Sequence, residues 1–165
     1  RFVDAVSGTG TKILDTRKTL PGMRALEKYA VRMGGGANHR SALSDGILIK
    51  ENHIRACGGI GRAVRKALSL APHGLRVEVE ATTLEEVREA LEAGAETILL
   101  DNMDAETLRE AVRLVSGAAR VEASGGVTLE NVREIAETGV DWISVGRITH
   151  SAPGVDISML VEEHG

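Results

Sequence analysis

An internal repeat constrains the fold of this chain more than any other feature of its sequence. Residues 83–102 (TLEEVREALEAGAETILLDN) align with residues 128–147 (TLENVREIAETGVDWISVGR), with nine identities in twenty positions at an offset of 45 residues. In each copy a threonine precedes apolar residues at helical spacing, a glycine ends the helix, and a buried strand follows. A third unit lies between the copies, with Asp104 as its expected cap, so the offset equals two helix–strand units.

The spacing of these units predicts the fold class. Strands that alternate with helices form a parallel sheet with right-handed crossovers. From residue 80 onward the expected strand ends recur every 21 to 23 residues. A complete eight-unit barrel needs about 250 residues. The chain of 165 residues therefore predicts an α/β fold, a TIM-like (β/α) barrel that is small or incompletely closed and has six to seven mainly parallel strands. A doubly wound open sheet is the alternative.

The first half of the chain is less regular, and its elements are predicted from local signals. Residues 2–6 look like the last turns of a helix, and a glycine-rich loop follows to residue 11. Further predictions are a strand at 12–16, a helix from Pro21 to Met33, an extended segment at 37–42, a strand at 47–50 and a helix at 53–70. In the repeat, Thr83 and Glu86 form an expected capping box, and Thr128 is the corresponding cap.

The charges of the chain are unevenly distributed. Residues 1–55 hold ten Lys and Arg against five Asp and Glu, although the whole chain has a net charge of −4. A local cationic region favours a pocket for a small anion over a broad nucleic-acid surface, and an aromatic content of 2% argues against base stacking. Cys57 is the single cysteine, and no apolar run approaches the roughly 18 residues of a membrane span. We therefore expect a cytoplasmic protein without nucleic-acid or membrane partners.

Polar residues or glycines follow each expected strand. Because the carboxyl ends of parallel strands open onto one face of a barrel, where ligands bind, we expect a shared site there. The residues concerned are Arg17, Lys18, Lys50, Glu80, Asp101, Ser124, Gly125, Gly126 and Gly146. Backbone N–H groups at Ser124-Gly125-Gly126 could hold a phosphate, with Val145-Gly146-Arg147 beside them, although paired glycines before a helix also form ordinary turns.

Two carboxylates end successive strands and form a candidate metal site. Glu80 and Asp101 could hold Mg²⁺, directly or through water, or accept hydrogen bonds from sugar hydroxyls. They could equally cap the following helices or pair with a lysine. Glu78 lies on the same side of its strand as Glu80 but deeper, so it ranks second.

The cationic residues near the strand ends are candidates for binding acidic groups. Arg17 and Arg40 offer planar forks for carboxylates, whereas Lys18 and Lys50 act as point charges. Each of them could also be ordinary solvated surface, and His39 could be a simple loop histidine.

Seven motifs occur in a fixed order along the chain and carry a family resemblance. They are DTRKT at 15–19, GGGANHR at 34–40, DGILIKENH at 45–53, EVE at 78–80, LLDN at 99–102, EASGG at 122–126 and VGRITHS at 145–151. Together they resemble quinolinate phosphoribosyltransferase, also called carboxylating nicotinate-nucleotide pyrophosphorylase. That family has an N-terminal α/β domain before its barrel. The resemblance implies that residues 1–11 join such a domain and that residues 12–165 form the phosphoribosyltransferase barrel domain.

The resemblance also implies an activity and its partners. Members transfer phosphoribose from phosphoribosyl pyrophosphate to quinolinate with decarboxylation, which gives nicotinate mononucleotide, CO₂ and pyrophosphate in de novo NAD synthesis. The cofactor is Mg²⁺. The family works as a homodimer or a higher oligomer in which the partner's N-terminal domain completes the site and adds an arginine. We therefore expect the 165-residue chain to be weakly active or inactive by itself.

Roles for the candidate residues follow from the same resemblance. The residues expected around the quinolinate carboxylates are Thr16, Arg17, Lys18, His39 and Arg40. The expected catalytic residues are Lys50, Glu80 and Asp101, which would face the ribose, the pyrophosphate and the metal. The expected phosphate-binding residues are Ser124, Gly125, Gly126, Val145, Gly146 and Arg147.

Three alternatives remain open from the sequence. One is a barrel lyase that forms a Schiff base on Lys50. Another is a non-catalytic relative or fragment that binds phosphate without turnover. A third is a phosphoribosyltransferase acting on nicotinate, which the number of cations near Arg17 and Arg40 disfavours because one carboxylate needs fewer.

Overall fold

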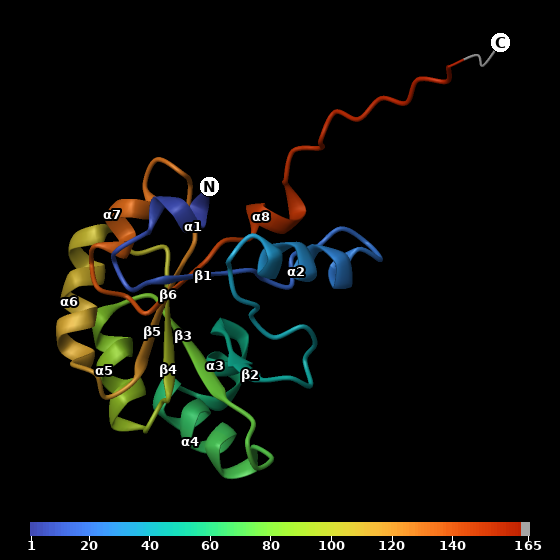
Figure 1. Cartoon of the computed structure of the whole chain (residues 1–165). Helices are drawn as coiled ribbons and strands as arrows, with labels where there is room; N and C mark the ends of the chain where they lie inside the picture. The colour runs from blue at the N-terminus through green and yellow to red at the C-terminus, as the bar shows by residue number, and fades with distance from the viewer. Residues whose placement is uncertain (163–165) are drawn as a thin grey trace.

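The computed structural model describes residues 1–162, and its centre is one sheet of six parallel strands (Figure 1). In spatial order the strands are β1 (Lys12–Leu14), β6 (Trp142–Ser144), β5 (Arg120–Ser124), β4 (Thr97–Asp101), β3 (Val77–Ala81) and β2 (Ile47–Ile49). Each strand from β2 to β6 lies beside the next in the sequence, and β6 returns to pair with β1. A doubly wound sheet would instead reverse its strand order in the middle. The prediction of a small, incompletely closed (β/α) barrel is thus confirmed.

The opening of the barrel lies between its two edge strands, β1 and β2. The segment that follows the second helix enters this region, because Ala37 forms an isolated parallel bridge with Leu14 of β1. The backbone N–H of Ala37 donates to Ile13 at 2.8 Å, and that of Asp15 donates to Ala37 at 3.2 Å. The predicted extended segment at 37–42 is therefore extended only at its start, where it runs along β1.

The described residues also form eight helices. They are α1 (Phe2–Ala5), α2 (Arg24–Met33), α3 (Glu51–Cys57), α4 (Ile60–Leu70), α5 (Leu84–Glu92), α6 (Ala105–Val115), α7 (Val132–Ala136) and α8 (Arg147–His150). Helices α4 to α7 pack side by side around the outer face of the sheet, and α2 packs against α8. After α8 the chain extends away from the body (Figure 1).

The two faces of the sheet have opposite character. Alternate strand residues that face the helices form the apolar core, and they include Val77, Val79, Ile98, Leu100, Val121, Ala123 and Ile143. The residues between them face the inside of the barrel. There Glu80, Leu99 and Glu122 lie in one row across β3, β4 and β5. The interior is therefore partly polar, unlike the branched apolar filling of a typical barrel.

The predicted helix caps are confirmed in the first repeat and in the middle unit. The hydroxyl of Thr83 accepts a hydrogen bond from the backbone N–H of Glu86 at 3.2 Å, and Asp104 accepts one from Thr107 at 2.8 Å. The hydrogen bond from the backbone N–H of Thr107 lowers the pKa of the Asp104 carboxyl from its usual value. The carboxylate of Glu86 accepts from the backbone N–H of Thr82 at 2.7 Å rather than from that of Thr83, so the prediction of a capping box is wrong.

Three helix boundaries differ from the prediction. Helix α2 begins at Arg24 because residues 21–23 form a turn. The predicted helix 53–70 is two helices, broken at Gly58 and Gly59, whose φ angles of +73° and +137° are incompatible with a continuing helix. Thr128 does not cap α7, which begins only at Val132.

Asn131 explains why the second repeat copy begins its helix late. Its side-chain oxygen accepts from the backbone N–H of Thr128 at 2.8 Å, and its side-chain nitrogen donates to the carbonyl of Gly126 at 3.1 Å. These bonds hold the chain in a loop through residue 131. Both copies keep the start of the following strand, at Thr97 in β4 and at Trp142 in β6.

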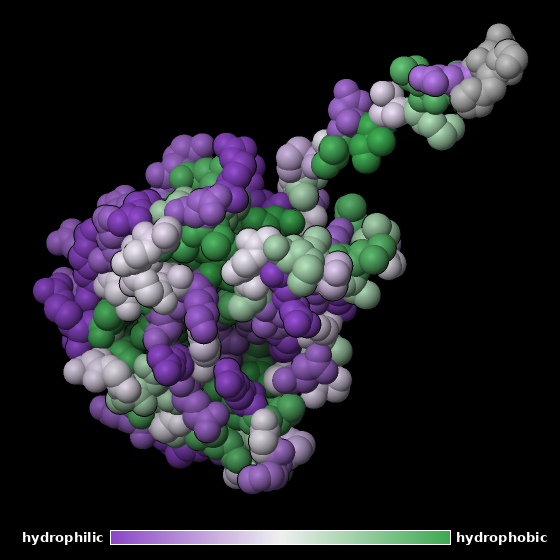
Figure 2. Space-filling view, in the orientation of Figure 1, coloured by the Kyte–Doolittle hydropathy of each residue, from purple (hydrophilic) through white to green (hydrophobic). Residues whose placement is uncertain are grey.

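The outer surface is mostly hydrophilic over α5, α6 and α7, whereas hydrophobic side chains gather at α2 (Figure 2). The exposed side chains at α2 include Met23, Leu26, Tyr29 and Met33. Among the described residues no helix is both long enough and apolar enough to span a membrane.

Candidate active site

One cavity of about 730 Å³ lies at the carboxyl ends of the strands. All fourteen candidate residues named from the sequence line it: Thr16, Arg17, Lys18, His39, Arg40, Lys50, Glu80, Asp101, Ser124, Gly125, Gly126, Val145, Gly146 and Arg147. The structure thus brings together residues that lie up to 131 positions apart in the chain. Their individual roles remain predictions.

Seven further residues of the same wall were not named from the sequence as site residues. They are Leu48, Leu99, Asn102, Glu122, Val127, Ser144 and His150. Leu48 and Leu99 give the cavity an apolar patch, which suits the face of an aromatic ring. Asn102 and Glu122 could have been named as site residues from the sequence, since each is a polar residue at the end of a buried strand or within one.

Lys50 and Glu80 form an ion pair at the cavity wall. They come from the adjacent ends of β2 and β3, and Nζ of Lys50 lies 2.5 Å from Oε2 of Glu80. The lysine side chain is about half exposed, at 52%. A lysine that forms a Schiff base needs a dry pocket or a neighbouring cation that favours its neutral amine. Lys50 has instead a carboxylate partner and solvent, which disfavours the lyase alternative.

The loops after β4 and β5 are packed directly against each other. The side chain of Asn102 donates to Oδ2 of Asp101 at 2.7 Å, and the backbone N–H of Asn102 donates to the carbonyl of Ser124 at 2.9 Å. A Cβ at Gly125 would lie only 2.2 Å from Oδ1 of Asn102. Gly125 also has a φ of +93°. The sequence requires glycine here, because any side chain would displace Asn102 from Asp101.

The donor set at the ends of β3 and β4 fits a magnesium ion. Mg²⁺ prefers oxygen ligands and is usually held by one or two carboxylates, with water and substrate phosphates completing its shell. Glu80 and Asp101 provide two carboxylates on adjacent strands of the same cavity wall. Glu80 pairs with Lys50 and Asp101 accepts from Asn102, so each carboxylate would share its oxygens between its partner and the metal.

A buried ion pair positions the segment that carries His39 and Arg40. Asp15 is fully buried and pairs with the ammonium group of Lys28. It also accepts from the backbone N–H of His39 at 2.9 Å, and Nζ of Lys28 donates to the carbonyl of His39 at 2.8 Å. The side chain of Asn38 donates to Asp15 at 2.5 Å. This network ties the loop at 38–40 to β1 and α2.

Arg40 and Arg17 make the cavity strongly cationic on this side. Burial and the positive charge of Arg17 lower the pKa of the Arg40 guanidinium from its usual value. One nitrogen of Arg40 donates to the carbonyl of Gly46 at 2.7 Å, while Nε of Arg17 is buried without a hydrogen-bond partner within the described residues. Two guanidinium groups that repel each other are stabilised by a shared anion.

His39 lies in a cluster with two buried glutamates. Its Nε2 is 3.0 Å from Oε2 of Glu78 and 3.8 Å from Oε1 of Glu122, and its Nδ1 accepts from the backbone N–H of Arg40 at 2.7 Å. Burial lowers the pKa of His39, but the two glutamates raise it by more, so the net direction is upward. Burial and the charge of Glu78 raise the pKa of Glu122 to about 8.

The cluster is also the one group of three potential metal ligands within residues 1–162, since its ligand atoms lie within 4.8 Å of one another. However, the Arg40 N–H points at Nδ1 of His39, which places the ring proton on Nε2. A metal at Nε2 would have to displace that proton. The geometry therefore describes a hydrogen-bonded cluster rather than a metal centre.

The fold and the cavity define a (β/α) barrel protein with a cavity at its strand ends that is lined by several cationic side chains. The sequence model of the quinolinate phosphoribosyl transferase C-terminal domain matches residues 1–160. The chain belongs to this family.

Comparison with known proteins agrees with this assignment. The chain is 53% identical over 148 residues to the probable carboxylating nicotinate-nucleotide pyrophosphorylase of Bacillus subtilis, covering 90% of this chain and 51% of that protein. It is 48% identical over 161 residues to the corresponding protein of Mycobacterium leprae, covering 96% and 56%. The solved nicotinate-nucleotide pyrophosphorylase of Francisella tularensis superposes with a TM-score of 0.91 at 48% identity, covering 95% and 56%. The chain spans about half the length of the curated relatives it matches.

Proposed function

We propose that this chain is the barrel domain of a carboxylating nicotinate-nucleotide pyrophosphorylase. The reaction joins quinolinate to phosphoribosyl pyrophosphate and yields nicotinate mononucleotide, CO₂ and pyrophosphate. The observation that carries the proposal is the convergence of cations, two carboxylates and two glycine loops on one cavity of a family member. The names of the relatives supply the reaction.

The first chemical step is an attack by the pyridine nitrogen on the anomeric carbon of the ribose as pyrophosphate leaves. The protein contributes position and charge rather than a covalent intermediate. Lys50 would stabilise the leaving pyrophosphate, and its ion pair with Glu80 would fix the direction of its ammonium group. Mg²⁺ held by Glu80 and Asp101 would offset the charge of the pyrophosphate when bound.

Quinolinate carries two adjacent carboxylates, which suits the cationic side of the cavity. Arg17, Lys18 and Arg40 line that side and can bind both groups. Both ring nitrogens of His39 are already engaged, by Glu78 and by the backbone of Arg40. His39 therefore contributes to binding by holding Arg40 in place.

The second step is the loss of CO₂ from the ring. Once its nitrogen carries ribose the ring is cationic, so the electron pair left at C2 is stabilised by the ring itself. The polyanionic phosphate of the product would remain at the backbone of Gly125, Gly126 and Gly146, which have no side chains to block it.

The proposal includes a homodimer in which a partner's N-terminal domain completes the site, and a cytoplasmic location. The support for the first part is that the matched relatives are about twice as long as this chain. We expect the 165-residue chain alone to show little or no activity for this reason.

The test uses two forms of the protein. One is the 165-residue chain, and the other is a chimaera in which it replaces the matching half of the Bacillus subtilis relative, to which it is 53% identical. Each form is mixed with quinolinate, phosphoribosyl pyrophosphate and Mg²⁺, and nicotinate mononucleotide is measured. We expect product from the chimaera, and none when nicotinate replaces quinolinate. An inactive but folded chimaera contradicts the proposal.

A further inference from the structure

Glu122 has no role in the steps above, although it lies in a cluster with His39 and Glu78 and lines the main cavity. Glu122 lies in the middle of β5 with 1% of its surface exposed. One side-chain oxygen of each glutamate, Oε1, has no hydrogen-bond partner within the described residues. Buried carboxylate oxygens without a donor are costly, so a carboxyl group in this position tends to keep its proton.

The charges of the cluster lead to the same conclusion. Two carboxylates within 4.8 Å of each other and of one imidazole cannot both be ionised cheaply in a buried site. The N–H at Nε2 of His39 donates to Glu78, with Nε2 and Oε2 3.0 Å apart. Glu122 does not receive this N–H, so it is the carboxyl group that holds a proton at neutral pH. The floor of a cationic cavity therefore contains a neutral carboxylic acid.

The position of this acid is unusual because it lies between two cavities. Glu122 and His39 line the main cavity, and together with Glu78 they also line a second cavity of about 540 Å³ at the opening between β1 and β2. The other charged residues that line the two cavities are Lys12, Arg17, Lys18, Arg40, Asp45, Lys50, Arg76, Glu80, Asp101 and Arg147. A group between the two cavities can meet a ligand on one side and exchange protons with solvent on the other.

We propose that Glu122 stores the proton that replaces the departing carboxyl group on the pyridine ring, with His39 and Glu78 holding it in place. This inference rests on the proposed function. It makes Glu122 a proton donor, whereas the steps described above use only the positions and charges of the side chains.

The step is balanced as follows. The bond between C2 and the carboxylate carbon breaks, CO₂ leaves, and the electron pair stays at C2. C2 takes the proton of the Glu122 carboxyl before CO₂ can add back to it, so the carboxyl becomes a carboxylate and the loss of CO₂ becomes irreversible. After the product has left, the carboxylate regains a proton from solvent through the second cavity. No oxidant or further reactant is needed.

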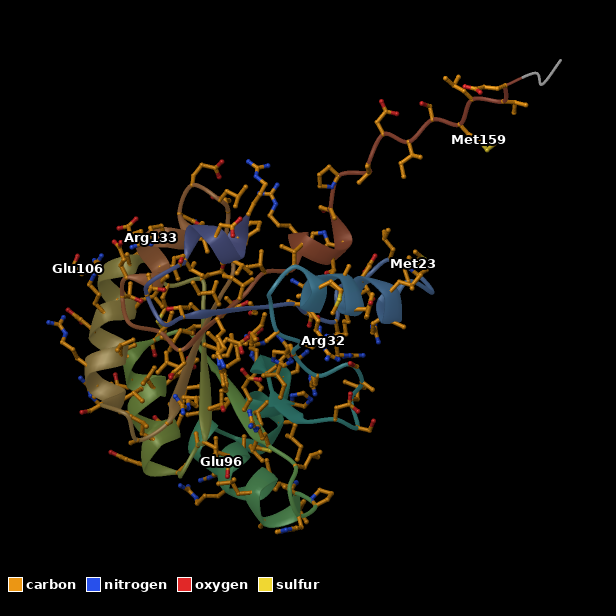
Figure 3. The ribbon with its side chains drawn as sticks, in the orientation of Figure 1. Met23, Arg32, Glu96, Glu106, Arg133 and Met159 are labelled. Atoms are coloured by element: carbon orange, nitrogen blue, oxygen red, sulfur yellow. The ribbon has the colours of Figure 1, made fainter. Side chains whose placement is uncertain are left out.

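The first experiment measures whether Glu122 is protonated and does not depend on activity. Carboxyl ¹³C NMR of the 165-residue chain with labelled glutamate is recorded against pH for the wild type and for Glu122→Gln, and the missing signal identifies Glu122. Glu106→Gln is the matched control, because it makes the same change on the outer side of α6 (Figure 3). We expect the Glu122 signal to be that of a protonated acid at pH 7. A carboxylate signal at pH 6 would overturn the inference and leave the proposed function untouched.

The second experiment measures both products in a single turnover of the chimaera. With wild type we expect pyrophosphate and CO₂ in equal amounts. With Glu122→Gln we expect pyrophosphate to form normally while CO₂ release slows at least tenfold, so that the undecarboxylated mononucleotide accumulates. Glu106→Gln should behave as wild type. Equal slowing of both products, or of neither, refutes the proton store, whereas a wild type that forms neither product refutes the proposed function and this inference with it.

Discussion

Replacing Gly125 with alanine tests the close contact between the loops after β4 and β5. The new Cβ would lie 2.2 Å from Oδ1 and 2.5 Å from Cγ of Asn102, far inside the 3.0 Å that real contacts respect. The φ of +93° adds backbone strain for any L-residue. Positive φ costs roughly 1–2 kcal/mol, and the lost hydrogen bond from Asn102 to Asp101 costs about 1 kcal/mol. We therefore expect a loss of about 2–3 kcal/mol in the free energy of unfolding.

Gly126→Ala is the matched control for this change. Gly126 has a φ of +58° and nothing within 4 Å of its would-be Cβ, so only backbone strain applies. Urea unfolding of both variants measures the difference, which we expect to be at least about 1 kcal/mol, or about 2–4 °C in melting temperature. Asn102→Gly should restore part of the loss in the Gly125→Ala background by removing the obstructing side chain. Equal destabilisation by the two alanines would refute the reasoning.

Four further predictions follow from the site. Arg40→Ala should weaken quinolinate binding to the chimaera at least tenfold by calorimetry, because a charge-assisted hydrogen bond is worth about 1.5–3 kcal/mol; unchanged affinity contradicts the role of Arg40. Asp101→Asn should lower turnover and raise the Mg²⁺ concentration needed for half-maximal rate. Asp15→Asn should cost about 3–5 kcal/mol in urea unfolding because it leaves Lys28 buried without its partner. Because the pKa of Glu122 is raised to about 8, protonated Glu122 stabilises the fold. This contribution is complete below the ordinary pKa of a glutamate and is lost as the pH rises through about 8. The free energy of unfolding should therefore depend less on pH in Glu122→Gln than in the wild type.

The sequence predicts the sheet and the wall of the cavity because both depend on local, repeated signals. Strand ends follow from the spacing of the repeat, and the caps at Thr83 and Asp104 follow from side chains that bond within three residues. In a parallel barrel every strand end opens on the same face, so the candidates at the strand ends could be placed together without knowledge of any contact. Thr16 and His39 joined them only through the family resemblance.

The remaining features depend on contacts that no local pattern encodes. The break at Gly58 and Gly59 requires positive φ at two successive residues, where a glycine pair inside a helical pattern suggests only a weakened helix. Asn131 displaces Thr128 as the organiser of its turn by bonding to Gly126 across the loop. The environment of Glu122 is formed by His39, from a segment 83 residues earlier, so its protonation could not be inferred from the strand RVEAS.

The division of the sheet into an apolar outer face and a polar inner face separates stability from chemistry. The helices hold the barrel together through residues such as Val79, Ile98 and Val121, which never meet the cavity. Inward residues such as Leu48, Leu99 and Ser144 line the cavity and can be exchanged with little effect on that outer layer. Such a scaffold can acquire specificity for new substrates when its inward residues change and its outward residues stay the same, in evolution as in the laboratory.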